Sequence, residues 1–351
     1  MKQGLIKLLK STTGCSLLMA AVIFIISRLT PASFIELYYS SGFYSIVSTP
    51  LLLISNALPF SLDDLLYGFL IVYLLTLILM TLLRKLAFVS FIKRIVLLTA
   101  VVYSLFVLFW GFNYHRSSLN DRLGLPSAKA NADELMQVFK KLIADLNTTY
   151  TPIYTLDKES VLHSVQSAYR SHASFLQIDT TLLKCTPKPI TLSRFFASAT
   201  ISGYYGPFFS EVHINHYLLT IDYPAVLAHE MAHRLGIASE AEANFYAWLV
   251  CSTSDDKRLA YSANLHLLHY FVYECYKLPG FKEAVKDLRY EVKHDFYKSN
   301  YHWLKLMNRN VEFVATKVND AYLKSNSLEE GIEDYDGVVK YVMDYTKYTA
   351  E

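Results

Sequence analysis

The chain reads HEMAHRLGIASE from His229 to Glu240, and this stretch decides how its second half is interpreted. Residues four apart lie on one face of an α-helix, so His229 and His233 can direct two imidazoles at one metal ion. Glu230 lies about 100° further round the helix, where it can take a proton from a water activated by that ion. The pattern therefore predicts a zinc site on a helix, with Glu230 as the catalytic base.

A catalytic zinc ion usually has three protein ligands, and Glu240 is the preferred candidate for the third. Gly236 can end the motif helix in the left-handed conformation, and Ser239 can cap a second helix that begins with Glu240. Glu242 is the rival ligand, although it also fits as the capping-box partner of Ser239. A distant third ligand, or none, is also open. Asn244 lies one turn after Glu240, where its amide could orient a ligating histidine from behind.

An ordinary polar helix face is the alternative to a metal site. The residues around the motif are largely apolar, with Val226, Leu227, Met231 and Ala232. Such a helix does not bury two imidazoles and a carboxylate without partners, because each unpaired buried polar group costs about 1–3 kcal/mol. A metal ion would satisfy all three groups at once, so we expect one. That metal could be catalytic, or it could remain as a structural ion in a degenerate enzyme.

The first third of the chain is too apolar for a soluble protein. The 351 residues are 53% hydrophobic, and the excess lies before residue 113. Three uncharged stretches are long enough to cross a bilayer, at about 11–27, 65–83 and 95–112. We therefore expect residues 1–112 to form a multi-span membrane region. Residues 113–351 are expected to form a mainly α (α+β) domain with a small β-sheet.

Basic residues near these stretches determine the expected topology. Lys2, Lys7 and Lys10 would hold the N-terminus in the cytoplasm, and four basic residues between the second and third stretches would form a cytoplasmic loop. The third stretch then leads outward, so the C-terminal domain is expected outside the cytoplasmic membrane. A cleaved signal peptide is the alternative for the first stretch, although no clean A-x-A site follows it.

The segment from 30 to 59 is apolar and aromatic but contains Pro31, Gly42, Pro50 and Pro59. We interpret it as an interfacial or re-entrant segment on the outer side of the membrane. A fourth, short span is the alternative, and it would place the C-terminal domain in the cytoplasm. The loop charges oppose that alternative.

Residues 187–215 change in character, with partial alternation that predicts a small sheet or hairpin. In zinc peptidases an edge strand beside the metal commonly binds extended substrate, and this segment is the candidate. Glu211, His213 and Asn215 would share one face of a strand and could line the cleft. A turn and strand with surface polar residues is the alternative. The flanking residues, including 132–146, 157–176 and 255–277, show helical periodicity.

Side chains that could contact the substrate or stabilise an oxyanion come from two segments. The helix expected at 255–277 carries two histidines and two tyrosines on a broad common face, and one of them could donate to the oxyanion. Taken with the strand segment, the candidate residues are Tyr205, His213, Asn215, His269 and Tyr270.

Cysteine spacing and net charge argue against other classes of site. Cys15, Cys185, Cys251 and Cys275 form no C-x-x-C pair, which speaks against a cysteine zinc site or a redox motif. Three buried thiols are expected for the last three, with one disulfide among them as the alternative. The net charge of +2 gives no sign of a nucleic-acid partner. The expected partners are the lipid bilayer and a peptide or protein substrate.

Four stretches make the chain resemble a family of bacterial membrane proteins of unknown function, DUF3810. They are WGFNY at 110–114, ISGY at 201–204 with Pro207-Phe208, HEMAHRLGIASEAEANF at 229–245 and NDAYLKSN at 319–326. The resemblance spans almost the whole chain. It implies a multi-span N-terminus in the bacterial cytoplasmic membrane and a zincin-like outer domain, and it supplies no substrate.

A looser likeness is to the gluzincins, in which a glutamate ligand is followed four residues later by aspartate. Here Asn244 stands at that later position, and the gap from His233 to Glu240 is shorter than in most gluzincins. The gap is closer to the metzincin spacing, H-E-x-x-H-x-x-G-x-x-H, in which Gly236 matches but Ser239 stands at the third ligand position. The clan therefore stays open.

Two functional hypotheses follow from these observations. The leading one is a membrane-anchored, zinc-dependent metallopeptidase that hydrolyses peptide bonds with Glu230 as general base. The alternative is a non-catalytic membrane scaffold or pseudo-enzyme with a structural metal site, which would have four protein ligands and no open position.

Overall fold

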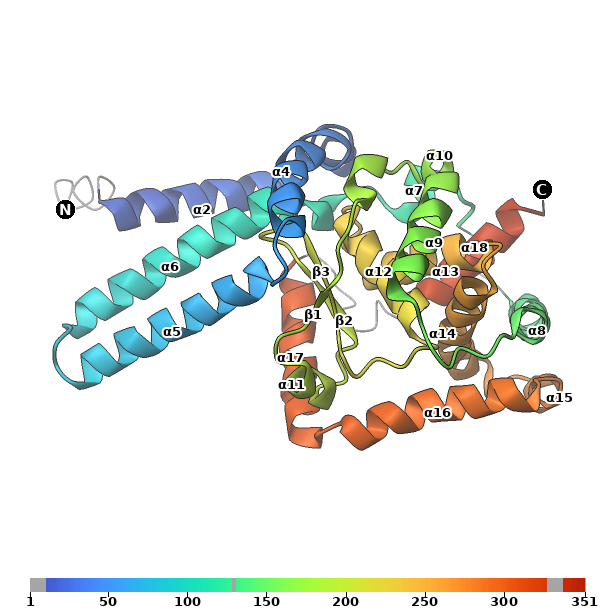
Figure 1. Cartoon of the computed structure of the whole chain (residues 1–351). Helices are drawn as coiled ribbons and strands as arrows, with labels where there is room; N and C mark the ends of the chain where they lie inside the picture. Colours follow the sequence, from blue (N-terminus) through green and yellow to red (C-terminus); the bar gives the residue numbers. More distant parts are fainter. Residues whose placement is uncertain (1–10, 128–130, 327–336, 351) are drawn as a thin grey trace. The chain divides into compact units, whose positions relative to one another are not determined.

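The computed structural model describes residues 11–127, 131–326 and 337–350 (Figure 1). The described chain is mostly helical, with one small sheet. It divides into two units, of which unit 1 comprises the residues up to Arg116 together with Gly206–Glu211. Unit 2 comprises Ser117–Tyr205 and the residues from Val212 onward.

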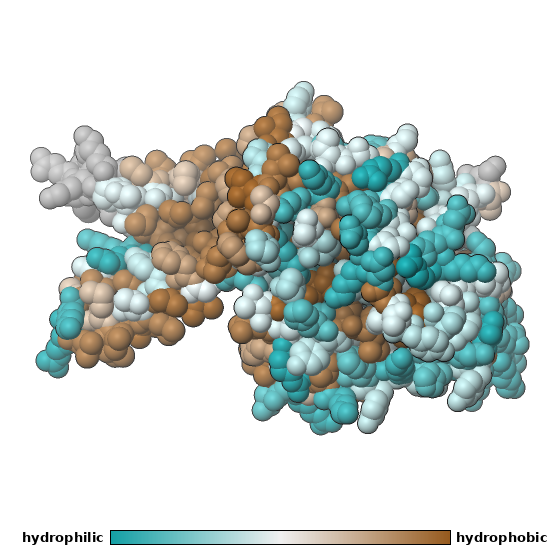
Figure 2. All heavy atoms as spheres, viewed as in Figure 1, coloured by the Kyte–Doolittle hydropathy of each residue, from teal (hydrophilic) through white to brown (hydrophobic). Residues whose placement is uncertain are grey.

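Unit 1 contains three helices that are long and apolar enough to cross a membrane, α2 (Thr12–Leu29), α5 (Leu62–Leu82) and α6 (Phe88–Phe109). The three apolar helices expected from the sequence are therefore confirmed. Hydrophobic side chains cover their surface, as is typical of helices that face lipid (Figure 2). Lys2, Lys7 and Lys10, on which the expected orientation partly rests, lie outside the described residues.

Two of these helices begin earlier than the hydropathy pattern predicts. α5 begins at Leu62 because Ser61 caps it, the Ser61 hydroxyl accepting a hydrogen bond from the N–H of Asp64 at 2.8 Å. α6 begins at Phe88 and therefore includes Lys93 and Arg94, which the charge pattern placed before the apolar stretch. Long basic side chains are tolerated near the end of such a helix because their charged groups can extend toward water.

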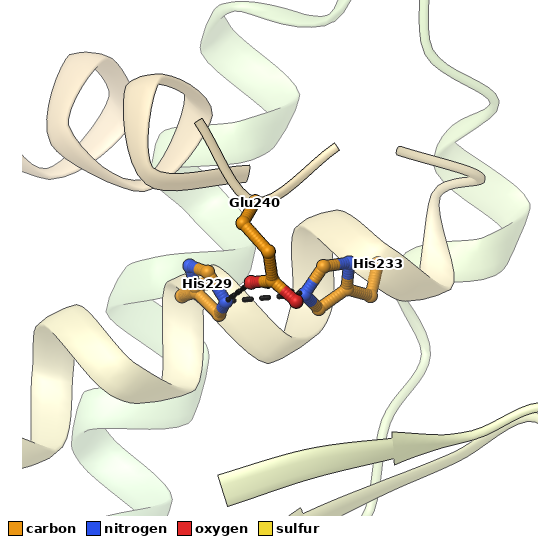
Figure 3. Close-up of side chains that lie close together, drawn as sticks. All are labelled: His229, His233 and Glu240. Carbon is orange, nitrogen blue, oxygen red and sulfur yellow. Dashed lines mark hydrogen bonds and ion pairs between the residues drawn. The ribbon is translucent and has the colours of Figure 1, made fainter. Parts of the chain in front are cut away.

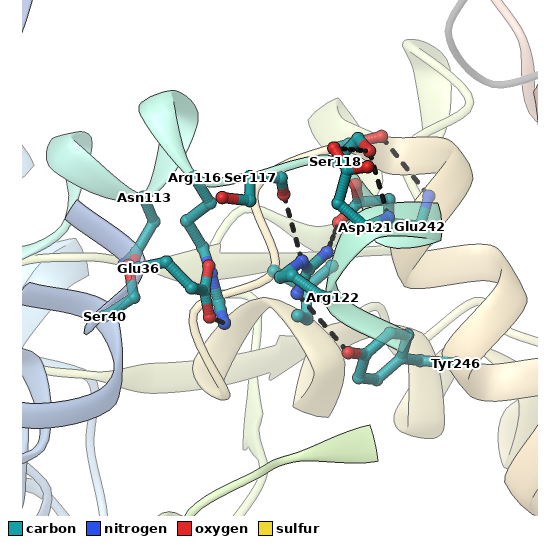
Figure 4. A network of polar contacts seen from close by, with 12 residues as sticks. Glu36, Ser40, Asn113, Arg116, Ser117, Ser118, Asp121, Arg122, Glu242 and Tyr246 are labelled. Atoms are coloured by element: carbon teal, nitrogen blue, oxygen red, sulfur yellow. Dashed lines mark hydrogen bonds and ion pairs between the residues drawn. The ribbon is translucent and has the colours of Figure 1, made fainter. Parts of the chain in front are cut away.

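Residues 32–56 are helical throughout, as α3 (Ala32–Phe34), the π-helix η1 (Ile35–Phe43) and α4 (Tyr44–Asn56). Gly42 and Pro50 lie inside this run and do not break it. Glu36 forms an ion pair with Arg116, in which Oε1 and Nη2 are 2.5 Å apart. This ion pair connects the helical run to the residues that follow α6 (Figure 4). Those residues begin with the 3-10 helix η2 (Gly111–His115).

The first turn of α5 is capped by a buried glutamate that lies about 150 positions later in the chain. Glu211 accepts hydrogen bonds from the Ser61 hydroxyl at 2.8 Å and from the N–H groups of Leu62 and Asp63 at 3.1 and 3.0 Å. The first N–H groups of a helix have no partner within it and carry a partial positive charge. A carboxylate at this position therefore satisfies donors that an apolar helix cannot satisfy itself.

Asp63 completes a reciprocal arrangement within unit 1. Its carboxylate is fully buried and accepts hydrogen bonds from the N–H groups of Phe208 and Phe209, both at 3.2 Å. The backbone at Gly206 lies against the same carboxylate, and a Cβ built there would overlap it. The segment 206–211 is therefore shaped by two carboxylates, and Gly206 cannot be replaced without moving one of them.

Replacing Glu211 by glutamine should lower the thermal stability of the full chain in detergent. The amide keeps the size but loses the charge and one acceptor oxygen, and a buried hydrogen bond to a charged group contributes about 1.5–3 kcal/mol. Glu283→Gln changes an exposed carboxylate and should leave the melting temperature unchanged. Equal melting temperatures for the two variants would show that the cap does not stabilise α5.

The core of unit 2 is formed by helices that pack around the HEMAH motif (Figure 1). Their facing side chains are apolar and buried, among them Leu227, Phe245 and Phe271. The first of them is capped by Asn131, with Glu134 as its capping-box partner. The core helices are α8 (Ala132–Thr149), α9 (Lys158–Ser171), α12 (Tyr223–Arg234), α13 (Glu240–Ser252), α14 (Lys257–Cys275) and α18 (Val338–Tyr348).

Shorter or peripheral helices complete the described part of unit 2. One of them ends at Lys286 and another at Leu306. The remaining helices are α7 (Leu119–Leu123), α10 (Ala173–Leu176), η3 (Thr180–Leu183), α11 (Ser193–Ser198), α15 (Phe281–Lys286), α16 (Tyr290–Leu306) and α17 (Arg309–Ser325).

The small sheet expected within residues 187–215 is confirmed. It has three strands in the order β1-β3-β2, namely β1 (Lys188–Pro189), β2 (Gly203–Gly206) and β3 (Glu211–Ile214). β1 and β3 are parallel, with Lys188 opposite His213. Four residues join β2 to β3, which is long enough for an antiparallel hairpin but not for a parallel crossover. Because β2 stands at the end of the strand order, it is an edge strand.

Candidate metal centre

A reversal of the chain between α12 and α13 positions the potential metal ligands. Pro224 lies in the first turn of α12, and Gly236 follows the helix with a φ of +81°. Three residues later, Ser239 caps α13 by accepting a hydrogen bond from the N–H of Glu242 at 3.3 Å. Glu240 is therefore the first residue of α13, and its side chain points back toward α12 (Figure 3).

His229, His233 and Glu240 each bring one donor atom to a common point (Figure 3). The two Nε2 atoms are 3.1 Å apart, and Oε2 of Glu240 lies 3.1 Å from that of His229 and 3.4 Å from that of His233. Among the described residues, this is the one cluster of His, Cys, Asp or Glu with a geometry that could hold a metal ion.

The orientation of His233 is fixed by the turn itself. Its Nδ1 lies 2.7 Å from the carbonyl oxygen of Ile237, to which it can donate a hydrogen bond. A neutral imidazole that donates from Nδ1 presents its unprotonated Nε2 to the cluster. The Nδ1 of His229 is buried and has no hydrogen-bond partner among the described residues.

Without a metal ion, the cluster is a buried ion pair. Burial alone would lower the pKa of His233, but the Glu240 carboxylate outweighs it and raises this pKa to about 9. Burial alone would raise the pKa of Glu240, but the two imidazoles hold it well below its usual range. A metal ion that binds here has to displace a proton, so its affinity falls as the pH is lowered.

Glu230 lies beside the cluster with an uncommitted oxygen. Its side chain is buried, and Oε2 has no hydrogen-bond partner among the described residues. Burial raises the pKa of Glu230, while His229 and His233 oppose that shift and Glu240 adds to it. The backbone of Gly203, at the start of β2, lies against the carboxylate, because a Cβ built there would be 2.6 Å from Oε1.

Glu242, the rival ligand, is committed to another partner. Its carboxylate forms an ion pair with Arg122, whose guanidinium also donates to the Tyr246 hydroxyl at 3.4 Å (Figure 4). This pair connects α7 to the first turn of α13 and therefore supports the segment that carries Glu240. Sequence reasoning did not identify Arg122, because a contact across 120 residues leaves no local pattern.

Asn244 contacts α14 and does not hydrogen bond to a histidine of the cluster. Its Nδ2 donates to the Tyr270 hydroxyl at 3.1 Å. The rings of His266 and Tyr270 meet edge to face with centroids 5.6 Å apart, and burial lowers the pKa of His266 to about 3. His269 stacks on Phe296 at a centroid distance of 4.3 Å, and burial lowers its pKa to about 4. Both histidines are therefore neutral at neutral pH.

The candidate residues of the strand segment occupy different environments. His213 is buried and stacks on Tyr204, with ring centroids 4.1 Å apart and planes within 9°. Asn215 is also buried, and its amide donates to two backbone carbonyls and accepts from one backbone N–H. Tyr205 is half-buried on β2. Of these candidates, Tyr205 is the one whose side chain is partly exposed on the edge strand.

The chain belongs to a family defined by sequence. Residues 39–343 match the model of the family described as Protein of unknown function (DUF3810). The match includes residues of both units and the whole stretch from His229 to Glu240. No curated protein and no solved structure matches the chain significantly.

Gly203→Ala should destabilise unit 2 and displace the Glu230 carboxylate. The added methyl group requires a shift of the side chain or of β2, and overpacking of this kind costs about 1–3 kcal/mol. Gly68→Ala is the matched control, because a Cβ at Gly68 meets no atom within 4 Å. Thermal melting of both variants in detergent provides the measurement. A Gly203→Ala variant as stable as Gly68→Ala would contradict the close contact.

Proposed function

We propose that this chain is a membrane-anchored, zinc-dependent metallopeptidase in which Glu230 is the general base. The convergence of His229, His233 and Glu240 is the observation that carries the proposal. In a tetrahedral zinc site with bonds of about 2.0–2.1 Å, neighbouring donor atoms lie about 3.3 Å apart. The three donor–donor distances of 3.1, 3.1 and 3.4 Å fit such a site. Imidazole and carboxylate are also ligands that zinc prefers.

The number of donors favours a catalytic over a structural metal. Structural zinc sites have four protein ligands, whereas catalytic sites have three and leave one position open. Among the described residues the cluster contains three. The alternative, a non-catalytic scaffold or pseudo-enzyme with a structural metal, requires a fourth protein ligand.

Glu230 supplies the proton chemistry in this proposal. A bound zinc ion would act as a Lewis acid that polarises the scissile carbonyl and lowers the pKa of water. Glu230 would accept a proton from the attacking water at its uncommitted Oε2 and then deliver it to the leaving amine as the C–N bond breaks. His269 and Tyr270 on α14 remain the candidates for contacts with the substrate or the oxyanion.

The edge strand β2 provides a template for an extended peptide. The outer edge of an edge strand presents backbone N–H and C=O groups that can pair with an added strand. Gly203 lies against Glu230, so a peptide paired with β2 would run past the general base. Tyr205 would contribute side-chain contacts on the same strand.

The proposal places unit 2 outside the cytoplasmic membrane of a bacterial cell. The turn between α5 and α6 carries Arg84 and Lys85, and α6 begins with Lys93 and Arg94 near its start. Basic residues are enriched on the cytoplasmic side of spanning helices. α6 would then lead to the outer side, where unit 2 begins.

The purified full chain should contain about one zinc ion per molecule, and Glu240→Gln should reduce the zinc affinity by more than about 100-fold. Glu242→Gln is the control, because its amide oxygen can still accept from Arg122 while its side chain lies outside the cluster. Inductively coupled plasma mass spectrometry gives the zinc content, and circular dichroism checks that each variant is folded. Equal zinc content in the two folded variants would exclude Glu240 as a ligand.

Glu230→Gln should retain zinc and lose peptide-bond hydrolysis by a factor of about 10²–10⁴, since it removes the general base. Mass spectrometry of new protein N-termini, in cells that produce the wild-type chain or Glu230→Gln, would reveal the cleaved proteins. The same zinc content with identical N-termini in both cultures would support the scaffold alternative. A wild-type chain without zinc would reject both hypotheses of a metal site.

A further inference from the structure

Helix α17 presents an apolar stripe to solvent. Val314 and Val318 are 59% and 63% exposed, which is unusual for valine in a folded domain. Leu323 is the one described residue of α17 that is buried, and it lies about 120° round the helix from the middle of the stripe. Val314 and Val318 therefore lie on the exposed side of α17. The apolar stripe recurs every three or four residues. Val314, Val318 and Tyr322 are its exposed members, and Val311 and Ala315 are half-buried at its inner edge.

The neighbouring helix α11 extends this apolar region. α11 contacts α17 directly. Leu192, just before α11, is 63% exposed, and Phe195 within it is 58% exposed. We refer to Leu192, Phe195 and the α17 stripe together as the α11–α17 surface. Exposed apolar groups on two helices that touch each other favour a contact with another molecule or with a membrane.

Three uncompensated cations surround the α11–α17 surface. Arg194 and Lys305 line a groove of about 940 Å³ that also contains Leu192 and Phe195. Lys317 lies on α17 between Phe313 and Val314 round the helix, with its ammonium 5.8 Å from the centroid of the Phe313 ring. None of these three cations forms an ion pair with a carboxylate of the described chain.

The acidic residues of α17 are satisfied within the helix. Glu312 accepts a hydrogen bond from the Thr316 hydroxyl at 2.9 Å, and Asp320 pairs with Lys324 at 2.9 Å. Lys324 therefore neutralises Asp320, whereas Glu312 keeps its charge, and the cations Arg194, Lys305 and Lys317 outnumber it around the apolar residues. An amphipathic helix with this distribution of side chains is typical of segments that lie in a membrane interface.

We propose that the α11–α17 surface docks on an anionic lipid bilayer. The valines and Phe195 would insert at the boundary between headgroups and acyl chains, while Arg194, Lys305 and Lys317 would contact phosphate groups. A bilayer is available to unit 2 because α6 is apolar enough to cross one. α6 ends at Phe109, shortly before Ser117, which is the first residue of unit 2. This contact is independent of the proposed peptidase activity.

A second copy of the chain fits the same surface less well. A twofold dimer presents the same patch from both subunits. Arg194, Lys305 and Lys317 would then approach their own copies, and like charges repel. Among the described residues of α17, Glu312 is the one carboxylate without an ion pair, so these three cations outnumber the carboxylates that could neutralise them. An anionic lipid surface supplies the missing negative charge and accepts the apolar residues as well.

Lipid quenching of a fluorophore on α17 tests the proposal. The full chain carrying Cys15→Ser is labelled with NBD at Val318→Cys and placed in nanodiscs of phosphatidylcholine and phosphatidylglycerol, with or without doxyl-labelled lipid. Cys185, Cys251 and Cys275 are buried and are not expected to react. We expect the doxyl lipid to reduce the emission at position 318 by about half, because the probe lies at the depth of the upper acyl chain.

Phe313→Cys is the matched control. Phe313 is 61% exposed, nearly the same as Val318, but it lies about 140° away round the same helix. Its emission should fall by less than about a fifth, and replacing phosphatidylglycerol by phosphatidylcholine should weaken the quenching at 318. Equal quenching at the two positions, or none at 318, would overturn the proposal. Self-quenching at 318 that grows with protein concentration and does not depend on doxyl lipid would instead identify a second copy as the occupant.

Discussion

The turn at Gly236 is the constraint on which the candidate metal centre depends. Its φ of +81° lies in a region that residues with a side chain rarely adopt. If the helix had continued, Glu240 would lie seven residues beyond His233, on nearly the same face but about 10 Å further along the axis. The reversal instead brings the carboxylate oxygen to 3.4 Å from the imidazole. The same turn supplies the Ile237 carbonyl that orients His233.

The convergence of His229, His233 and Glu240 could be predicted because the signals that position them are local. The spacing of two histidines, the glycine and the Ser239 cap act within about one turn of the residues they position. Contacts that cross the sequence could not be predicted. Gly203 reaches Glu230 through a strand of four residues, and Arg122 holds the rival Glu242 across 120 positions. Alternation along β3 correctly suggested a strand, but it could not show that His213 would be stacked on Tyr204 or that Asn215 would be used by the backbone.

Unit 1 shows the same difference between local and distant determinants. Length and hydropathy were sufficient to predict three apolar helices. They placed the start of α5 too late, because Asp63 and Asp64 count against an apolar stretch when they are considered alone. Asp63 is buried at the helix start because it accepts from Phe208 and Phe209. Pro50 was expected to interrupt its segment, yet it lies within α4 and does not end it, although proline has no N–H to donate to the fourth preceding carbonyl.

The cap on α5 has a consequence for how the protein is made. Ser61 and Glu211 are 150 residues apart, so a ribosome that adds about 5–20 residues per second needs about 8–30 s to synthesise the second after the first. During that interval the start of α5 lacks the carboxylate that satisfies its N–H groups. Unit 1 therefore cannot reach its final state until Glu211 has been synthesised, and its assembly awaits translation of the segment Gly206–Glu211, which interrupts unit 2 in the sequence.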